Sequence, residues 1–161
     1  MKKIEYEDVS IAICFDDILH EALAESSYLA ASTAALAQPE PRVSQLIITT
    51  DEMPLVHRAC HEAYAAILPR LSAYAGEGSA ATDEGVTFAL RLPLERSESI
   101  DALLLHELRR AIVSYLLSRW FYGKSAQLAA DALRRYEASV GMVLHDIRLT
   151  QAATRRPVNY F

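Results

Sequence analysis

Two long segments with helical periodicity, separated by one glycine, constrain this sequence more than any other feature. They cover residues 100–122 and 125–150, and in each the apolar residues recur every three or four positions. Gly123 lies between them, and glycine commonly ends a helix in a left-handed conformation. Helices joined by so short a connection pack antiparallel. We therefore predict a helical hairpin at the centre of the fold, with its core formed by Ile112, Leu116, Leu133, Val140 and Leu144.

The residues before the hairpin predict two further helices and two or three short strands. Residues 9–15 and 85–93 alternate between apolar and other side chains with the period of a strand, and residues 43–49 are interpreted as a third strand or an extended lead-in. Helices are expected over residues 18–36 and 50–74, with Pro69 kinking or dividing the second. Residues 75–84 are expected to be flexible. The fold class is thus mainly α, with about four helices, a C-terminal antiparallel helical hairpin and a small β element.

Length and composition indicate one domain. The chain has 161 residues, of which 52% are hydrophobic, enough to build one core, and no linker divides it. Pro157 cannot continue a helix, so residues 154–161 are expected to form an extended C-terminal tail of the single domain 1–161.

The sequence predicts a soluble protein of the cytoplasm without a membrane segment. Acidic residues follow Met1 where the apolar part of a signal peptide would begin, and the apolar run from Ile11 to Phe15 is too short to span a bilayer. Cys14 and Cys60 both have apolar neighbours, and we interpret them as two buried thiols in a reducing compartment.

Charge is distributed unevenly along the chain. Residues 1–99 hold seven Lys and Arg against sixteen Asp and Glu, a balance of −9, whereas residues 100–161 hold nine against five, a balance of +4; the two sum to the net charge of −5. Such polarity suits head-to-tail association of identical copies, although two simply solvated surfaces would give the same count. Because the protein is acidic overall, we do not expect direct contact with nucleic acid.

One group of side chains invites a metal hypothesis. His57 and His61 are four residues apart on an expected helix, with Cys60 beside them, so both imidazoles can approach one ion. A complete site would need further ligands, such as His20 or Asp17, and the alternative is two surface histidines flanking a buried cysteine. We predict that no metal and no cofactor is bound, and we recognise no catalytic constellation.

The hypothesis that this protein binds another copy or another protein rests on three consecutive aromatic residues and on the C-terminal tail. Trp120, Phe121 and Tyr122 are consecutive, and because neighbours on a helix point about 100° apart, at least one must leave the core. The tail offers Arg155 and Arg156 for acidic surfaces and Val158, Tyr160 and Phe161 as apolar anchors. It can dock on a neighbouring copy or fold back near Trp120 of its own chain.

The segment from Arg110 to Tyr122, the Gly123 turn, the helix with Arg134, Arg135, Tyr136 and Glu137, and the closing residues 155–161 resemble small bacteriophage or prophage virion-assembly proteins. Head–tail connector and neck proteins of this kind are compact helical domains with extended arms that assemble into rings. The resemblance covers roughly the last 60 residues and implies a homo-oligomer, in a ring or with other virion proteins.

Three functional hypotheses follow. The first is a non-enzymatic structural or assembly protein that self-associates through complementary charge and its C-terminal arm. The second is a small metal-binding or hydrolytic protein that uses His57, Cys60 and His61. The third is an adaptor domain that binds another protein through the helical hairpin.

Overall fold

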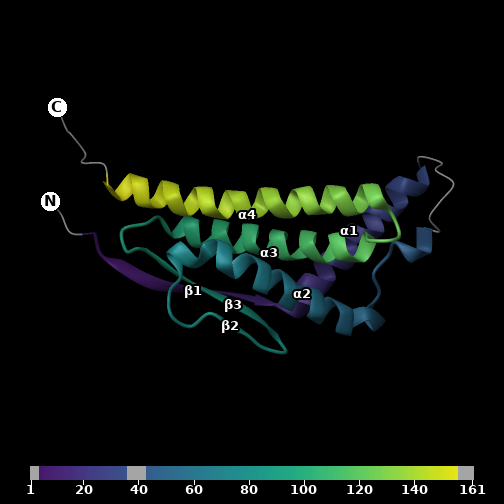
Figure 1. The fold of residues 1–161 in the computed structure, drawn as a ribbon, viewed down its shortest axis with the longest axis horizontal. Coiled ribbons are helices and arrows are strands. Elements are labelled where there is room, and N and C mark those ends of the chain that lie inside the picture. Colours follow the sequence, from purple (N-terminus) through teal and green to yellow (C-terminus); the bar gives the residue numbers. More distant parts are fainter. Residues whose placement is uncertain (1–3, 36–42, 156–161) are drawn as a thin grey trace.

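The computed structural model describes residues 4–35 and 43–155, and it confirms a mainly α fold with a small antiparallel sheet (Figure 1). In chain order the elements are β1 (Tyr6–Cys14), α1 (Phe15–Ala35), the 3-10 helices η1 (Val43–Gln45) and η2 (Thr50–Glu52), α2 (Met53–Ile67), the 3-10 helix η3 (Leu68–Tyr74), β2 (Ala80–Ala81), β3 (Gly85–Pro93), α3 (Glu98–Phe121) and α4 (Ala126–Arg155).

Helices α3 and α4 form the predicted antiparallel hairpin (Figure 1). Gly123 has φ of +81°, and the backbone N–H groups of Lys124 and Ser125 both donate to the carbonyl of Phe121 at 2.9 Å, which closes the turn. Midway along the hairpin the rings of Tyr115 and Tyr136 meet edge to face, with centroids 5.3 Å apart.

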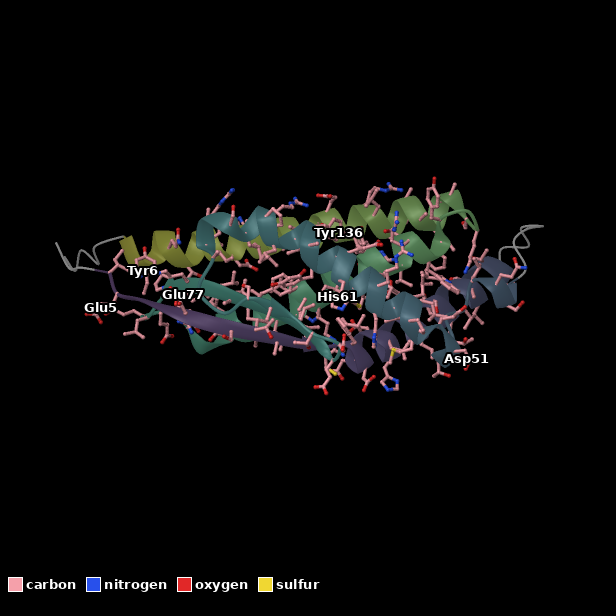
Figure 2. All side chains as sticks on the ribbon, turned by 60° about the horizontal axis from the view of Figure 1, so that its bottom comes forward. Glu5, Tyr6, Asp51, His61, Glu77 and Tyr136 are labelled. Atoms are coloured by element: carbon pink, nitrogen blue, oxygen red, sulfur yellow. The ribbon has the colours of Figure 1, made fainter. Side chains whose placement is uncertain are left out.

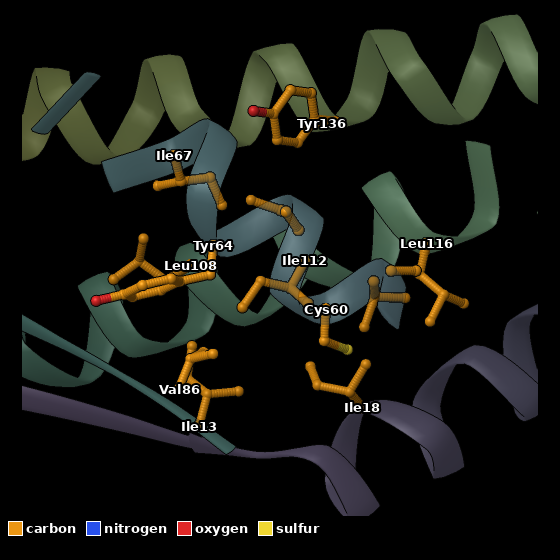
Figure 3. Packing of buried hydrophobic residues seen from close by; sticks show 14 of the residues in the cluster. Ile13, Ile18, Cys60, Tyr64, Ile67, Val86, Leu108, Ile112, Leu116 and Tyr136 are labelled. Atoms are coloured by element: carbon orange, nitrogen blue, oxygen red, sulfur yellow. The ribbon is translucent and has the colours of Figure 1, made fainter. Parts of the chain in front are cut away.

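Helix α3 is the central element of the molecule. From Ala111 to Ser118 every side chain except that of Tyr115 is buried, because α1, α2, α4 and β1 all pack around this helix. Figure 3 shows Ile112 and Leu116 of α3 close to Cys60 of α2 and Ile18 of α1. Along this stretch other elements surround α3, so its apolar residues there are not confined to one stripe, whereas Leu103, Leu105 and Arg110 nearer the start of the helix are exposed.

The sheet has the strand order β1-β3-β2, and both pairings are antiparallel. β1 and β3 pair along their full length, from Tyr6 opposite Pro93 to Cys14 opposite Gly85. A side chain at position 85 would bring its Cβ within 2.3 Å of the carbonyl oxygen of Ile13, so this close pairing requires glycine. Ile11 and Ile13 turn toward the core, as the alternation predicts.

The segment between α1 and α2 differs from the expected third strand. Leu46 and Ile48 are buried, but within the described chain no strand pairs with residues 43–49; Val43–Gln45 form a 3-10 turn. The N–H of Ile48 donates to Oγ of Ser26 on α1 at 3.1 Å, and Thr49 and Glu52 form a capping box ahead of α2. Pro69 divides the predicted 50–74 helix, since the α-helix ends at Ile67 and continues as η3.

Several boundaries and burial predictions were wrong. β2 lies inside the stretch expected to be flexible, and α4 continues to Arg155, so residues 154 and 155 are helical rather than part of a tail. Cys14 is exposed, because it belongs to the outward face of β1. Residues 156–161 lie outside the described part of the chain.

The predicted hairpin core needs one correction in particular. Ile112, Leu116 and Val140 are buried and Leu144 is half-buried, but Leu133 is 48% exposed. Helix α4 buries a narrow stripe, namely Ala132, Tyr136, Ser139, Val140, Val143, Asp146, Ile147 and Thr150. Leu133 follows Ala132 by one residue, which rotates it about 100° out of that stripe.

Candidate interaction surfaces

The aromatic cluster at the end of α3 divides between core and solvent. Phe121 is fully buried, Trp120 is 9% exposed, and Tyr122 is 80% exposed, which confirms that one of the three leaves the core. The indole Nε1 of Trp120 donates to the carbonyl of Leu46 at 2.8 Å. This bond joins α3 to the segment before α2, so Trp120 has a structural role at the hairpin end, whereas Tyr122 is available for contact.

A shallow depression opens beside Trp120. It encloses about 10 Å³, room for about one water molecule, and its wall consists of Ile48, Glu52, Leu55, Val56, Ala59, Leu116, Arg119 and Trp120. Leu55 is 45% exposed at this site. The depression arises where α2 crosses the end of α3, so the residues that form it are not adjacent in the sequence.

Charged groups surround the apolar floor of the depression. Nζ of Lys124 lies 2.8 Å from the centroid of the Trp120 ring, a cation–π contact. Burial lowers the pKa of the Lys124 ammonium, and the nearby carboxylate of Glu52 opposes that shift. Figure 2 shows Asp51 at this end of the molecule, far from Glu5 and Tyr6 at the other end.

The three candidate metal ligands do not converge. The rings of His57 and His61 pack against Phe15, with centroid distances of 4.9 and 5.2 Å, while Cys60 is fully buried. Figure 3 shows Cys60 within the core cluster, close to Ile18. Residues 4–35 and 43–155 contain no group of three or more His, Cys, Asp or Glu side chains arranged to hold a metal ion.

The two cysteines should differ sharply in reactivity. Burial raises the pKa of the Cys60 thiol to about 12, so at pH 8 only about one molecule in ten thousand carries the thiolate that attacks a disulfide reagent. Cys14 is exposed on β1. We expect Ellman's reagent to titrate Cys14 alone in the folded protein and both thiols after denaturation. A Cys14→Ser variant that still reacted rapidly before denaturation would contradict this prediction.

Several oppositely charged residues of the two halves of the chain form ion pairs with each other within the molecule. Basic residues of the hairpin pair with acidic residues of α1 and α2: Arg109 with Glu21 at 2.7 Å and Asp17 at 3.6 Å, Arg119 with Glu62 at 3.4 Å, and Arg135 with Glu25. Each such surface pair contributes at most about 1 kcal/mol. The uneven charge along the sequence therefore reflects the packing of an acidic N-terminal half on a basic hairpin, and it carries less weight for self-association.

Helix α4 carries the chain away from the turn of the hairpin. Trp120 lies at the turn end of the hairpin, and the thirty residues of α4 carry the chain about 45 Å from that turn (Figure 1). Arg155, the last described residue, therefore lies at the opposite end of the hairpin from Trp120.

Comparisons with protein-family models, with curated proteins and with solved structures find no match for this chain. Among the described residues, no helix is both long enough and apolar enough to cross a membrane.

Proposed function

We propose that this protein is a non-enzymatic assembly protein whose copies associate, with residues 156–161 of one copy docking at the depression beside Trp120 of the next. The proposal rests on where the two contact sites lie in the molecule. The docking surface and the point where α4 releases the chain lie at opposite ends of one long hairpin. A contact between opposite ends of identical molecules is heterologous, and repetition of such a contact builds rings or filaments.

The chemistry of the two partners is complementary. The depression combines an apolar floor with the carboxylate of Glu52, which Asp51 precedes in η2, and with the guanidinium of Arg119, whose charge is paired with Glu62 at 3.4 Å. The segment brings Arg156, followed by the apolar side chains of Val158, Tyr160 and Phe161. Proline has a fixed φ and disfavours the α conformation of the residue before it, so Pro157 reduces the entropy lost when the segment is ordered. Exposed Tyr122 and Leu55 enlarge the apolar area that the segment can cover.

This type of association fits the resemblance to bacteriophage head–tail connector and neck proteins, which form rings by repeated contacts between identical copies. We therefore propose a virion-assembly role, with synthesis in the host cytoplasm and with other virion proteins as further partners. Both cysteines are free thiols, which suits a reducing compartment.

Deletion of residues 156–161 tests this proposal. Without the docking arm the truncated chain should form smaller assemblies, so light scattering should give a lower molar mass than for the full chain. Its circular dichroism spectrum and melting temperature should stay close to those of the full chain. Leu55→Glu should have the same effect at the acceptor, since it places a charge in the apolar depression, whereas Leu94→Glu at another exposed leucine should leave the mass unchanged.

An unchanged mass after the deletion would overturn the arm-docking proposal. A lower melting temperature at unchanged mass would show that residues 156–161 pack on their own chain instead. If a different protein uses the depression, Leu55→Glu would abolish binding of that protein without any effect on the mass of the isolated chain, and the adaptor hypothesis would replace this one.

A further inference from the structure

We infer that the outer edge of β1 is a second self-association surface, at which the β1 strands of two copies pair antiparallel into one continuous sheet. The inference rests on the proposed function, because it names a surface through which copies associate. Its evidence is a separate observation, namely the direction in which the backbone N–H and C=O groups of β1 point.

The hydrogen-bond pattern of the sheet fixes that direction. The N–H of Phe15 donates to the carbonyl of Glu84, and the N–H of Leu94 donates to the carbonyl of Glu5, both at 2.9 Å. These bonds lie at the two ends of the β1–β3 pairing, and they show that odd-numbered residues of β1 bond to β3. The even-numbered residues therefore direct their N–H and C=O groups away from β3. These are Tyr6, Asp8, Ser10 and Ala12, together with the N–H of Cys14, whose C=O lies at the start of α1.

The opposite edge of β3 confirms this alternation. The N–H of Ala89 donates to Oγ of Ser79, and the carbonyl of Ala89 accepts from the N–H of Gly76, both at 2.9 Å on the β2 side. Ala89 stands opposite Ser10, so that pair exchanges no backbone bonds within the sheet. Nothing in residues 4–35 and 43–155 pairs with the outer edge of β1, where it is the terminal strand of the sheet.

β1 has few of the features that protect the edge strands of proteins. Proteins shorten their edge strands, bend them with bulges, or place proline and charged side chains on them, and β1 carries charges only at Glu7 and Asp8, near its start. β1 has nine residues, pairs with β3 without a bulge, and contains neither proline nor lysine. An edge of this length with free backbone groups is a template for another strand.

A second copy of β1 fits this template in one register better than in others. With Ser10 opposite Ser10 of the other copy, all nine residues are paired, and the outward groups of the two strands meet. The acidic residues then oppose uncharged ones, Glu7 facing Ile13 and Asp8 facing Ala12. A shift that places Asp8 opposite Asp8 costs like-charge repulsion and leaves strand ends unpaired. The contact is isologous, so it pairs copies two by two and complements the end-to-end contact of the arm.

Ser10→Lys in the full chain tests this inference by mass. The substitution places two ammonium groups directly opposite each other across the two-fold axis, which is destabilising. We expect a lower mass in light scattering than for the wild type, with an unchanged circular dichroism spectrum, because the side chain of residue 10 is exposed. Ser10→Thr keeps a β-compatible side chain, and Ala31→Lys adds the same charge on an exposed position of α1. Both controls should retain the wild-type mass.

A cross-link tests the register independently of folding effects. In the proposed pairing the two Cα atoms of residue 10 lie about 5.5 Å apart, within the range that a disulfide bridges. Ser10→Cys in a Cys14→Ser background should therefore give a covalent dimer on mild oxidation, and Leu133→Cys in the same background should not. Unchanged mass for Ser10→Lys together with no cross-link at residue 10 would overturn the inference.

The experiments can refute each of the two proposed contacts independently of the other. If deletion of residues 156–161 lowers the mass but the changes at Ser10 have no effect, the arm contact stands and the β1 pairing is wrong. If the changes at Ser10 act and the deletion does not, the β1 pairing stands and the arm contact is wrong. If Ser10→Lys disturbs the fold, the oxidation experiment alone decides.

Discussion

Leu116→Ala should lower the free energy of unfolding by about 2–5 kcal/mol, the usual cost of truncating a buried leucine. Leu116 is 3% exposed and lies on the side of α3 that faces α2, where it lines the depression together with Val56 and Ala59. The sequence placed this residue between α3 and α4, so the loss is expected for a different reason: the substitution opens space under α2. Urea denaturation followed by circular dichroism measures it.

Leu133→Ala is the matched control for that experiment. The substitution removes the same atoms from a side chain that is 48% exposed, so a loss well below that of Leu116→Ala is expected. Equal losses for the two variants would mean that Leu133 is buried after all. A loss below about 1 kcal/mol for Leu116→Ala would contradict the packing of α2 on α3.

Trp120→Ala should have an effect of similar or larger size, about 3–5 kcal/mol. The indole is 9% exposed, and it holds the segment before α2 through its bond to the carbonyl of Leu46. Its removal leaves a cavity and a buried carbonyl without its donor. Chemical denaturation monitored by circular dichroism is the appropriate measurement, because Trp120 is the one tryptophan of the chain and its fluorescence is lost with it.

Trp120→Phe separates the two contributions. Phenylalanine fills most of the volume but cannot donate to Leu46, and an unsatisfied buried carbonyl costs about 1–3 kcal/mol. We expect its loss to be smaller than that of Trp120→Ala. A Trp120→Phe variant as stable as the wild type would show that the bond to Leu46 makes no net contribution.

Local rules in the sequence were sufficient to predict most of the fold. Gly123 marked the hairpin turn because a left-handed residue is needed there, and the alternation in 85–93 marked the strand that became the centre of the sheet. Pro69 divided its helix for the reason expected of proline. Each of these features is determined by a few residues that are neighbours in the chain, so it can be predicted from a single sequence.

The incorrect predictions have a common cause, because they depend on contacts between residues that are far apart in the sequence. Leu46 and Ile48 have the alternation of a strand, but they are buried by α1 and α3 without a partner strand, which no local pattern can indicate. The exposure of Leu133 depends on which stripe of α4 packs against its neighbours. Ion pairs such as Arg109 with Glu21 join residues far apart in the sequence, so the charge count could not show that they neutralise each other.

The candidate surfaces were only partly predictable. The emergence of Tyr122 followed from helix geometry alone. The depression did not, because Leu55 and Arg119 come together only when α2 packs on α3. The open edge of β1 also required the structure, since its strand order places β3, and not β1, at the centre of the sheet.

Sedimentation velocity of the full chain over a range of concentrations tests self-association most directly. The chain mass is 17.9 kDa, and we expect species at multiples of this value whose fraction rises with concentration. Truncation of residues 156–161 and Ser10→Lys should each shift that distribution toward smaller species. A single species of 17.9 kDa at every concentration would contradict both proposed contacts and the self-association on which the proposed function depends.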